Sequence, residues 1–421
     1  MAVIQFRRPG RTDGQEQYDN GRADFDEEVL AEEPERNTAD ETAGSVRRSR
    51  GKRLLRTLLL AALFAAGAYL IYYVSSTRSY AGASYTKVAD MITQEGTWHE
   101  ALGGSVVSYS ADGASCMDAS GKSAWSITYE MQQPMVSVNG TIIAIGDYNG
   151  SEIHVLNSQK ELCKINTNMP LRALYASAGG EVAAVLADTK ATWIYLYKAD
   201  GSEIAYFKTT MKQSGYPAAV AISPKGQLAG VSFLTMGSTQ ANSSIAFYNF
   251  GAVGQNTSEN NVAGFNFDNQ IFPYLTFLDA TSSVGVSDSQ IVFFNGDEIP
   301  EQGKTDTFGD AQVEAVYTGD KLIAVVLAGA GDQAQHTMRI YNAAGEKVSQ
   351  ITFSMEYTDV QIANGHVFVY NAQKLQVYSP DGTKKYDGEF KMDVVKLIPS
   401  AGQANKMLLV TENSLESMTL E

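Results

Sequence analysis

The side chains best suited to chemistry are few and widely separated in this sequence. The four histidines are His99, His154, His336 and His366, and no two of them have the spacing of metal ligands. The HExxH pattern of zinc proteases and the GxSxG turn of serine hydrolases do not occur. We therefore expect no catalytic residues, no metal and no cofactor. His154 and His366 are expected to be structural strand residues, and His336 a solvated loop residue.

Two further groups suggest chemistry at first sight. Gly121-Lys122-Ser123 matches the end of a phosphate-binding loop, but Cys116 stands where that motif needs its first glycine. No helix is expected after this segment, so the motif lacks its structural context. Cys116 and Cys163 could form a disulfide outside the cytoplasm, yet we favour two separate, small buried residues.

Charge divides the chain into segments. The 421 residues carry 47 acidic and 32 basic side chains, for a net charge of −15, which argues against a nucleic-acid-binding protein. Residues 1–53 are polar and mostly acidic, and they end in a basic cluster. We predict that they form a disordered cytoplasmic tail. The basic residues around that boundary are Arg47, Arg48, Arg50, Lys52, Arg53 and Arg56.

Residues 54–74 form an apolar stretch that predicts one transmembrane helix. No charge occurs from Thr57 to Val74, and a helix of about 20 residues crosses a bilayer. The basic cluster precedes this stretch and only Arg78 follows closely. Because basic residues favour the cytoplasmic side, we expect the N-terminus in the cytoplasm and the C-terminal domain outside the cell membrane.

Residues 98–421 repeat one pattern of short strands and tight turns. Each unit has a strand that ends in a large residue, and these positions lie 37 to 51 residues apart: Met117, Leu156, Tyr197, Tyr248, Phe294, Tyr341, Tyr378 and Met418. A repeat of about forty residues with four strands is typical of a β-propeller. We predict an all-β fold of eight blades, with seven as the alternative.

The eighth unit is one strand short. Its expected strands are residues 394–398, 407–410 and 415–420, after which the sequence given stops. We expect the missing outer strand within residues 85–102, so that residues 75–97 hold a linker and a possible closing strand. Such closure removes a free sheet edge.

One segment carries a family resemblance. Gly121–Trp125 resembles the end of the repeats in quinoprotein-type (PQQ-like) propellers, where a turn glycine precedes a tryptophan that packs between blades. The other units have Cys163, Phe207 or Val348 near that position. The acidic tail, the predicted span and the stretch from Asp112 to Pro134 together carry a second resemblance. In these features the chain resembles an uncharacterised family of single-pass propeller proteins from Gram-positive, clostridia-type bacteria. This resemblance implies a fold and a topology, but no activity.

Variable loops suggest where a partner would bind. The loops between second and third strands are long at residues 234–244 and 328–336, and GDYNG occupies 146–150. They share a rim with the fourth-to-first connections, including part of 255–270, and propeller function usually resides on such a rim. The candidate residues are Asp147, Tyr148, Asn149, Met236, Gln240, Phe265, Phe267 and His336.

These features predict a non-enzymatic binding platform at the cell envelope. It would be anchored in the membrane and bind an envelope protein, a peptide or a cell-wall ligand. The alternative is a small-ligand sensor or an enzyme that uses the channel mouth, where Asp147, Asp188 and Asp288 would converge from different blades.

Overall fold

The computed structural model describes residues 56–67, 79–91, 93–188, 191–210, 212, 214–237, 240–329 and 335–421. The chain divides into two units, residues 1–74 and 75–421. In the first unit, residues 56–67 are helical, with exposed side chains that include Leu63 and Phe64. The predicted tail and the remainder of the predicted span lie outside the described residues. Among the residues that are described, no helix has both the length and the apolar character needed to cross a bilayer.

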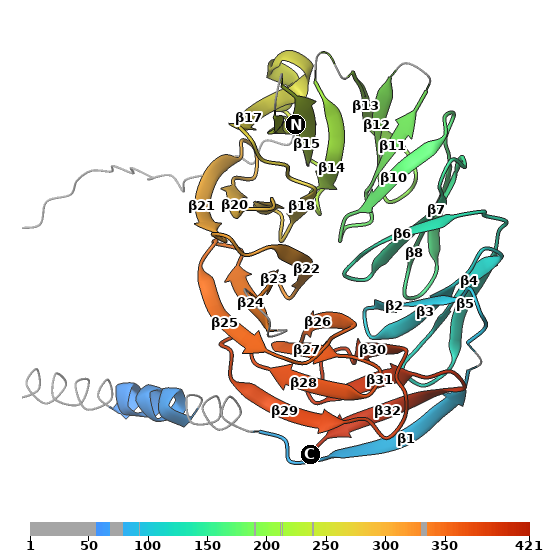
Figure 1. Cartoon of the computed structure of the whole chain (residues 1–421), viewed down its shortest axis with the longest axis vertical. Helices are drawn as coiled ribbons and strands as arrows, with labels where there is room; N and C mark the ends of the chain where they lie inside the picture. Colours follow the sequence, from blue (N-terminus) through green and yellow to red (C-terminus); the bar gives the residue numbers. More distant parts are fainter. Residues whose placement is uncertain are drawn as a thin grey trace, which may run out of the picture. The chain divides into compact units, whose positions relative to one another are not determined.

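The second unit is an eight-bladed β-propeller, and Figure 1 shows its sheets arranged in a ring. Each blade is an antiparallel sheet of four strands, which confirms the expected all-β class and the count of eight rather than seven. Blade 1 comprises β2 (Trp98–Leu102), β3 (Ser105–Tyr109), β4 (Gly113–Met117) and β5 (Ser123–Thr128). Blade 2 comprises β6 (Pro134–Asn139), β7 (Ile142–Asp147), β8 (Glu152–Asn157) and β9 (Glu161–Asn166). Blade 3 comprises β10 (Leu171–Ala176), β11 (Val182–Ala187), β12 (Thr192–Tyr197) and β13 (Glu203–Thr209).

The next three blades follow the same order. Blade 4 comprises β14 (Tyr216–Ile222), β15 (Leu228–Met236), β16 (Ala241–Asn249) and β17 (Asn261–Phe267). Two short 3-10 turns, η1 (Gly254–Asn256) and η2 (Ser258–Asn260), lie between its last two strands. Blade 5 comprises β18 (Tyr274–Phe277), β19 (Ser282–Val286), β20 (Gln290–Asn295) and β21 (Glu301–Thr307). Blade 6 comprises β22 (Val313–Gly319), β23 (Leu322–Ala328), β24 (His336–Asn342) and β25 (Lys347–Phe353).

The last two blades complete the ring. Blade 7 comprises β26 (Asp359–Ala363), β27 (His366–Tyr370), β28 (Lys374–Tyr378) and β29 (Lys384–Glu389). Blade 8 comprises β30 (Lys396–Pro399), β31 (Lys406–Val410), β32 (Ser414–Leu420) and β1 (Ala83–Asp90). The positions that define the sequence repeat all fall on or beside the ends of third strands, as the pattern predicts.

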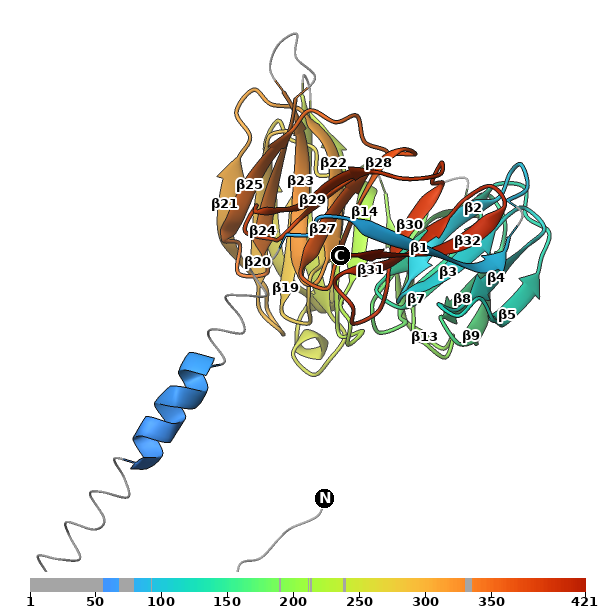
Figure 2. The ribbon, with the colours of Figure 1, turned by 90° about the horizontal axis from the view of Figure 1, so that it is seen from below.

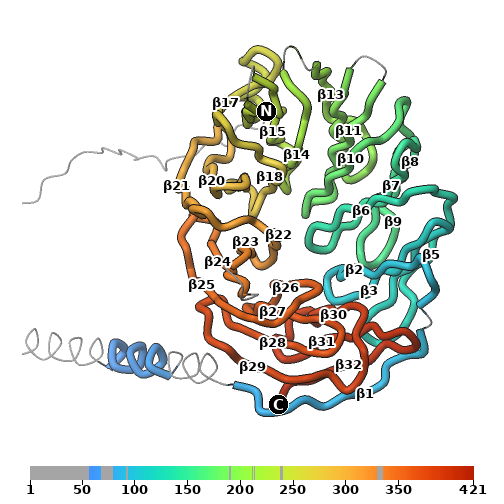
Figure 3. The backbone as a smooth tube through the Cα atoms, viewed as in Figure 1, coloured from blue at the N-terminus to red at the C-terminus, as the bar shows by residue number. Residues whose placement is uncertain are grey.

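Closure of the ring depends on β1. This strand pairs antiparallel with β32 from Ala83 opposite Leu420 to Asp90 opposite Ser414, and Figure 3 shows β1 running beside β32. The chain after β1 continues the pairing, because the Met91 and Thr93 amides donate to carbonyls of the β31–β32 hairpin. The expected closing strand is therefore confirmed, although it begins two residues earlier than the segment predicted for it.

Burial follows the position of a strand within its blade. Second strands such as β7, β11 and β23 are almost wholly buried, because neighbouring blades cover both of their faces. The outer strand β21 is exposed along nearly its whole length and reads EQGKTDT. This gradient explains why apolar runs mark the second strands while outer strands are polar.

The propeller has two rims, which can be followed in Figure 2. We call the edge formed by second-to-third hairpins and fourth-to-first connections the upper rim, and the opposite edge the lower rim. The loop expected at 234–244 is shorter than predicted, because β15 runs to Met236 and β16 begins at Ala241. The 328–336 loop has nearly the expected bounds, between Ala328 and His336.

The seam between β1 and β32 gives a stability prediction. Leu415→Ala removes a fully buried side chain from this sheet and should lower the free energy of unfolding by about 2–5 kcal/mol. Lys87→Ala in β1 is the control, since its partner Asp90 is exposed and such pairs contribute about 1 kcal/mol or less. Urea unfolding of the full chain measures both, and equal losses would contradict the assigned closure.

Candidate functional site

Exposed apolar side chains concentrate on the upper rim. Six large ones lie at its strand ends or connections: Trp98, Tyr148, Tyr216, Met236, Ile271 and Val395. Four others in the described part of the propeller lie elsewhere: Val138, Tyr206, Ile299 and Val348. Apolar groups that gather on one face, rimmed by polar groups, mark interaction surfaces.

The upper rim is also acidic. Its described loops contain ten carboxylates: Glu95, Asp112, Glu130, Asp188, Asp268, Asp288, Asp310, Glu356, Asp393 and Glu412. Those same loops contain two basic residues, Lys212 and Lys391. The lower-rim loops have equally many carboxylates but five lysines: Lys122, Lys160, Lys198, Lys225 and Lys321. The upper rim is therefore the more negative edge of the described propeller.

Tyr148 and Asn149 form a braced contact on this rim, in the β7–β8 hairpin. Arg172 of the next blade donates hydrogen bonds to the Tyr148 hydroxyl at 3.2 Å and to the Asn149 side-chain oxygen. Its guanidinium carbon also lies 5.3 Å from the centre of the Tyr148 ring. Asn149 adopts a positive φ of 67°, which asparagine tolerates well. Both predicted residues are thus on the rim and held in place by a neighbouring blade.

The three acids expected at the channel mouth do not converge there. The Asp147 carboxylate accepts from the amides of Gln132 and Gln133, at 3.1 and 2.7 Å, and fixes the connection before β6. Asp188 accepts from the Ala191 amide within its own hairpin, and Asp288 is exposed in the β19–β20 hairpin. These hairpins follow the second strands of three different blades. In each blade the first strand lies between the second strand and the channel.

The remaining candidates divide into exposed and buried residues. Met236 is 68% exposed, and Gln240 closes its hairpin through a carbonyl that accepts from Gly237. Phe265 and Phe267 were expected in or beside a fourth-to-first connection; both belong to β17, and Phe267 is its last residue before that connection. Phe267 is buried against Phe272, and Phe265 packs against Phe294 of the next blade.

His336 is misplaced by the sequence analysis. It is the first residue of β24, its side chain is mostly buried, and its Nδ1 lies 2.7 Å from the Glu314 carboxylate. The ring packs against Phe353 and Tyr357. Phe353 lies opposite His336 on the paired strand β25, and Tyr357 is in the connection that follows, so these contacts depend on a strand register that the sequence pattern does not specify.

The other histidines and the cysteines are structural. His154 is buried between the carboxylates of Glu152 and Glu161, each 2.6 Å from a ring nitrogen. Cys116 and Cys163 are both free thiols, as favoured from the sequence. Burial raises the pKa of Cys116 to about 11 and also raises that of Cys163, so both are weak nucleophiles.

Charged side chains from three blades meet in the channel wall at the closing seam. Lys396 of blade 8 lies 2.9 Å from the Glu100 carboxylate of blade 1 and 3.0 Å from the Asp359 carboxylate of blade 7. The Tyr370 hydroxyl and the Gln361 amide also donate to Asp359. Burial alone would lower the pKa of Lys396, but the two carboxylates more than offset it and raise that pKa. This ion triad was not predicted, because Glu100 lies 296 residues from Lys396 in the sequence.

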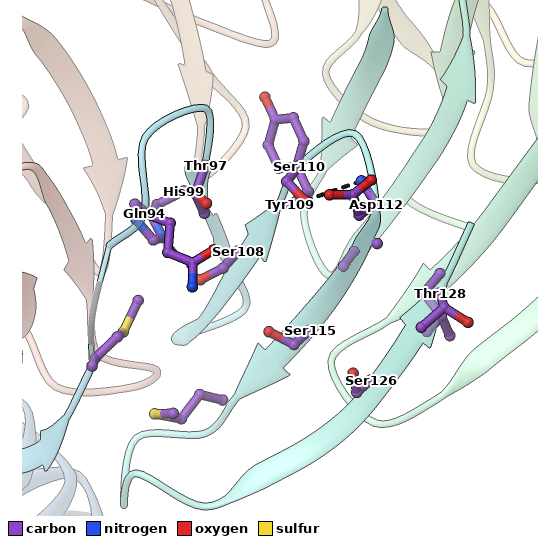
Figure 4. A pocket seen from close by; sticks show the side chains of 15 residues that line it. Gln94, Thr97, His99, Ser108, Tyr109, Ser110, Asp112, Ser115, Ser126 and Thr128 are labelled. Atoms are coloured by element: carbon purple, nitrogen blue, oxygen red, sulfur yellow. Dashed lines mark hydrogen bonds between the residues drawn. The ribbon is translucent and has the colours of Figure 1, made fainter. Parts of the chain in front are cut away.

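A groove opens on the upper rim beside this seam, and Figure 4 shows its lining. The buried His99 forms its inner end, with Nδ1 2.9 Å from the Ser108 hydroxyl and Nε2 3.2 Å from Thr93. Burial, followed by the charge of Lys396, lowers the pKa of His99 to about 4. His99 is therefore neutral at pH 7.

Trp125 fulfils the role expected from the repeat resemblance. Its indole nitrogen donates to the Asn157 carbonyl of the next blade at 2.8 Å. Residues 76–420 match the model of the Family of unknown function, DUF5711. The chain is a member of the DUF5711 family.

Solved structures similar to this DUF5711 protein are β-propellers of low sequence identity. The C-terminal WD40 domain of Sif2 is 11% identical with a TM-score of 0.51, and the match covers 80% of this chain and 98% of that one. BamB from Moraxella catarrhalis is 10% identical with a TM-score of 0.47, covering 80% and 100%. A search of curated protein sequences finds no match. The likeness to the Sif2 domain supports the fold and nothing further.

The ion triad yields a second stability prediction. Lys396→Met should lower the free energy of unfolding by about 3 kcal/mol at pH 7, because Glu100 and Asp359 would keep their charges without a cation. Lys384→Met, at the exposed pair with Asp387, should cost less than about 1 kcal/mol. Urea unfolding at pH 7 and pH 3 measures both. A Lys396→Met loss that is equally large at pH 3 would contradict this account, because protonated carboxylates no longer need the cation.

The His99 environment predicts acid sensitivity. The folded state holds His99 neutral down to about pH 4, whereas the unfolded state takes up a proton near pH 6.5. The unfolded state thus binds more protons in this window, so up to about 3 kcal/mol of stability present at pH 7 is lost as the pH falls to 4. His99→Gln should flatten this part of the stability curve, as measured by urea unfolding at pH 7 and 4.5. Parallel curves for the two proteins would exclude His99 as the titrating group.

Proposed function

We propose that this DUF5711 protein is a non-enzymatic binding platform at the cell envelope. One membrane span would anchor it, and the propeller outside the cell would bind a protein, a peptide or a cell-wall ligand through its upper rim. The observation that carries the proposal is that, of the ten exposed large apolar side chains in the described part of the propeller, six lie on that rim. Burying such side chains against a partner supplies most of the free energy of association.

The bracing of the rim supports a binding role. The bonds from Arg172 to Tyr148 and Asn149 join blade 2 to blade 3, and Asp147 fixes the neighbouring connection. A surface that is already ordered loses little conformational entropy when a partner binds. This arrangement favours recognition of a partner with a defined shape.

The sequence before the propeller supports the anchored topology. The basic cluster around residues 47–56 precedes the apolar stretch 54–74, which is the order that keeps an N-terminus in the cytoplasm. The resemblance to single-pass propeller proteins of Gram-positive bacteria agrees with this orientation. The acidic tail would then lie inside the cell and the upper rim outside it.

One experiment tests location and binding together. Met236→Cys places an exposed thiol on the upper rim, and the native cysteines should react slowly because burial raises their pKa values. One sample of intact cells is treated with a membrane-impermeant maleimide, and a separate sample with an impermeant thiol-to-amine crosslinker. We expect labelling from outside and a discrete crosslinked product.

Ile299→Cys on the lower rim is the matched control, since Ile299 is also exposed. It should be labelled from outside but give no crosslinked product. Labelling that requires broken cells would refute the proposed orientation. Identical products from both variants, or none from Met236→Cys, would refute binding through the upper rim.

A further inference from the structure

The groove on blade 1 offers a more specific conclusion about the partner. We define the blade 1 groove as the cavity of about 370 Å³ on the face of β2–β5, covered at one side by the connection from β1 to β2. Asp112, in the β3–β4 hairpin, stands at its upper-rim end (Figure 4). The cavity is therefore continuous with the surface proposed to bind a partner.

A row of polar side chains crosses the floor of this groove. His99 pairs with Ser108, Ser108 with Ser115, and Ser115 with Ser126 in the register of the four strands, so all four share one face of the sheet. His99 is buried, while Ser115 and Ser126 are exposed. Hydroxyls thus extend from the ring interior to the outer strand.

Several of these groups are available to a ligand. Within the described residues, the side chains of Ser115, Ser126 and Asp112 have no hydrogen-bond partner, whereas those of His99 and Ser108 satisfy each other. The Asp112 backbone amide donates to Ser110, which fixes the hairpin and leaves the carboxylate free. Free hydroxyl and carboxylate oxygens are hydrogen-bond acceptors.

The charge of the lining favours a cation. Among the described residues that line the groove, Asp112 is the one carboxylate, and there is no lysine or arginine. His99 is neutral at pH 7 and so does not repel a positive group. Carboxylates outnumber basic residues in the described upper-rim loops. Their negative field adds to that of Asp112 and steers cations towards this edge.

The groove also has apolar walls. Met91 and Met117 line it. Met117 lies two residues after Ser115 in β4 and so shares its face of the sheet. Lysine and arginine combine an aliphatic stem with a charged head, so they match apolar walls with acceptors at one end.

We propose that the blade 1 groove binds a lysine or arginine side chain of a polypeptide partner, with the charged head at Asp112 and the serine hydroxyls and the stem against Met91 and Met117. The inference rests on the proposed function, because it concerns the partner that binds the same rim. Of the ligand classes that the platform could bind, it selects a polypeptide with basic side chains.

The test uses the full chain in mild detergent and fluorescein-labelled oligoarginine, with oligoglutamate as the opposite-charge probe. Fluorescence anisotropy should show binding of oligoarginine that weakens with salt, and no binding of oligoglutamate. Asp112→Asn combined with Met117→Ala should weaken oligoarginine binding at least about tenfold. Asp297→Asn combined with Ile299→Ala, an exposed pair on the lower rim, should change it less than about twofold.

Ser115→Val provides a second variant that tests the floor without changing charge. It should also weaken oligoarginine binding, and circular dichroism and thermal unfolding show that each variant is folded. Equal losses in the upper-rim and lower-rim variants, or binding of oligoglutamate, would overturn the inference.

The inference and the proposed function fail in different ways. If crosslinking through Met236→Cys captures a partner whose binding is unchanged by the Asp112 and Met117 substitutions, the groove assignment is wrong and the platform function stands. If no partner is captured while oligoarginine binding depends on the groove, the groove assignment stands and the platform function is wrong.

Discussion

The pairing of β1 with β32 is the constraint on which the rest of the propeller depends. Seven blades are hairpins of consecutive strands and need only local pairing, whereas the eighth joins segments from opposite ends of the domain. The ion triad of Glu100, Lys396 and Asp359 spans the same seam on the channel side. Blade 1 and the groove on its face keep their position because this seam is held at both its outer and its inner edge.

A closed ring explains how short loops can form a defined surface. The upper-rim hairpins are mostly a few residues long, and several are fastened to the adjacent blade, as Arg172 fastens Tyr148. The position of each rim side chain is therefore set by the strands beneath it rather than by the loop itself. Trp98 and Met236 are strand-end residues for this reason, and their exposure results from the ring geometry.

The sequence predicted the fold far better than the site. Apolar second strands, turn dipeptides and a period of about forty residues are local signals, so the blade count, the closing strand and the free cysteines could be deduced. His336 was expected in a solvated loop, but it packs against Phe353 and Tyr357, and Phe265 packs against Phe294 of the next blade; such contacts depend on strand register and blade packing. The Lys396 triad and the row from His99 to Ser126 arise from strand register and ring closure, which no local pattern encodes.

The position of β1 has a consequence for biogenesis. A ribosome makes β1 first and its partner β32 more than three hundred residues later. During that interval the nascent chain can complete blades 1 to 7 in turn, but β1 has no sheet to join. Ring formation must therefore wait until translation is nearly finished, and incomplete chains expose an open sheet edge that chaperones or proteases can recognise.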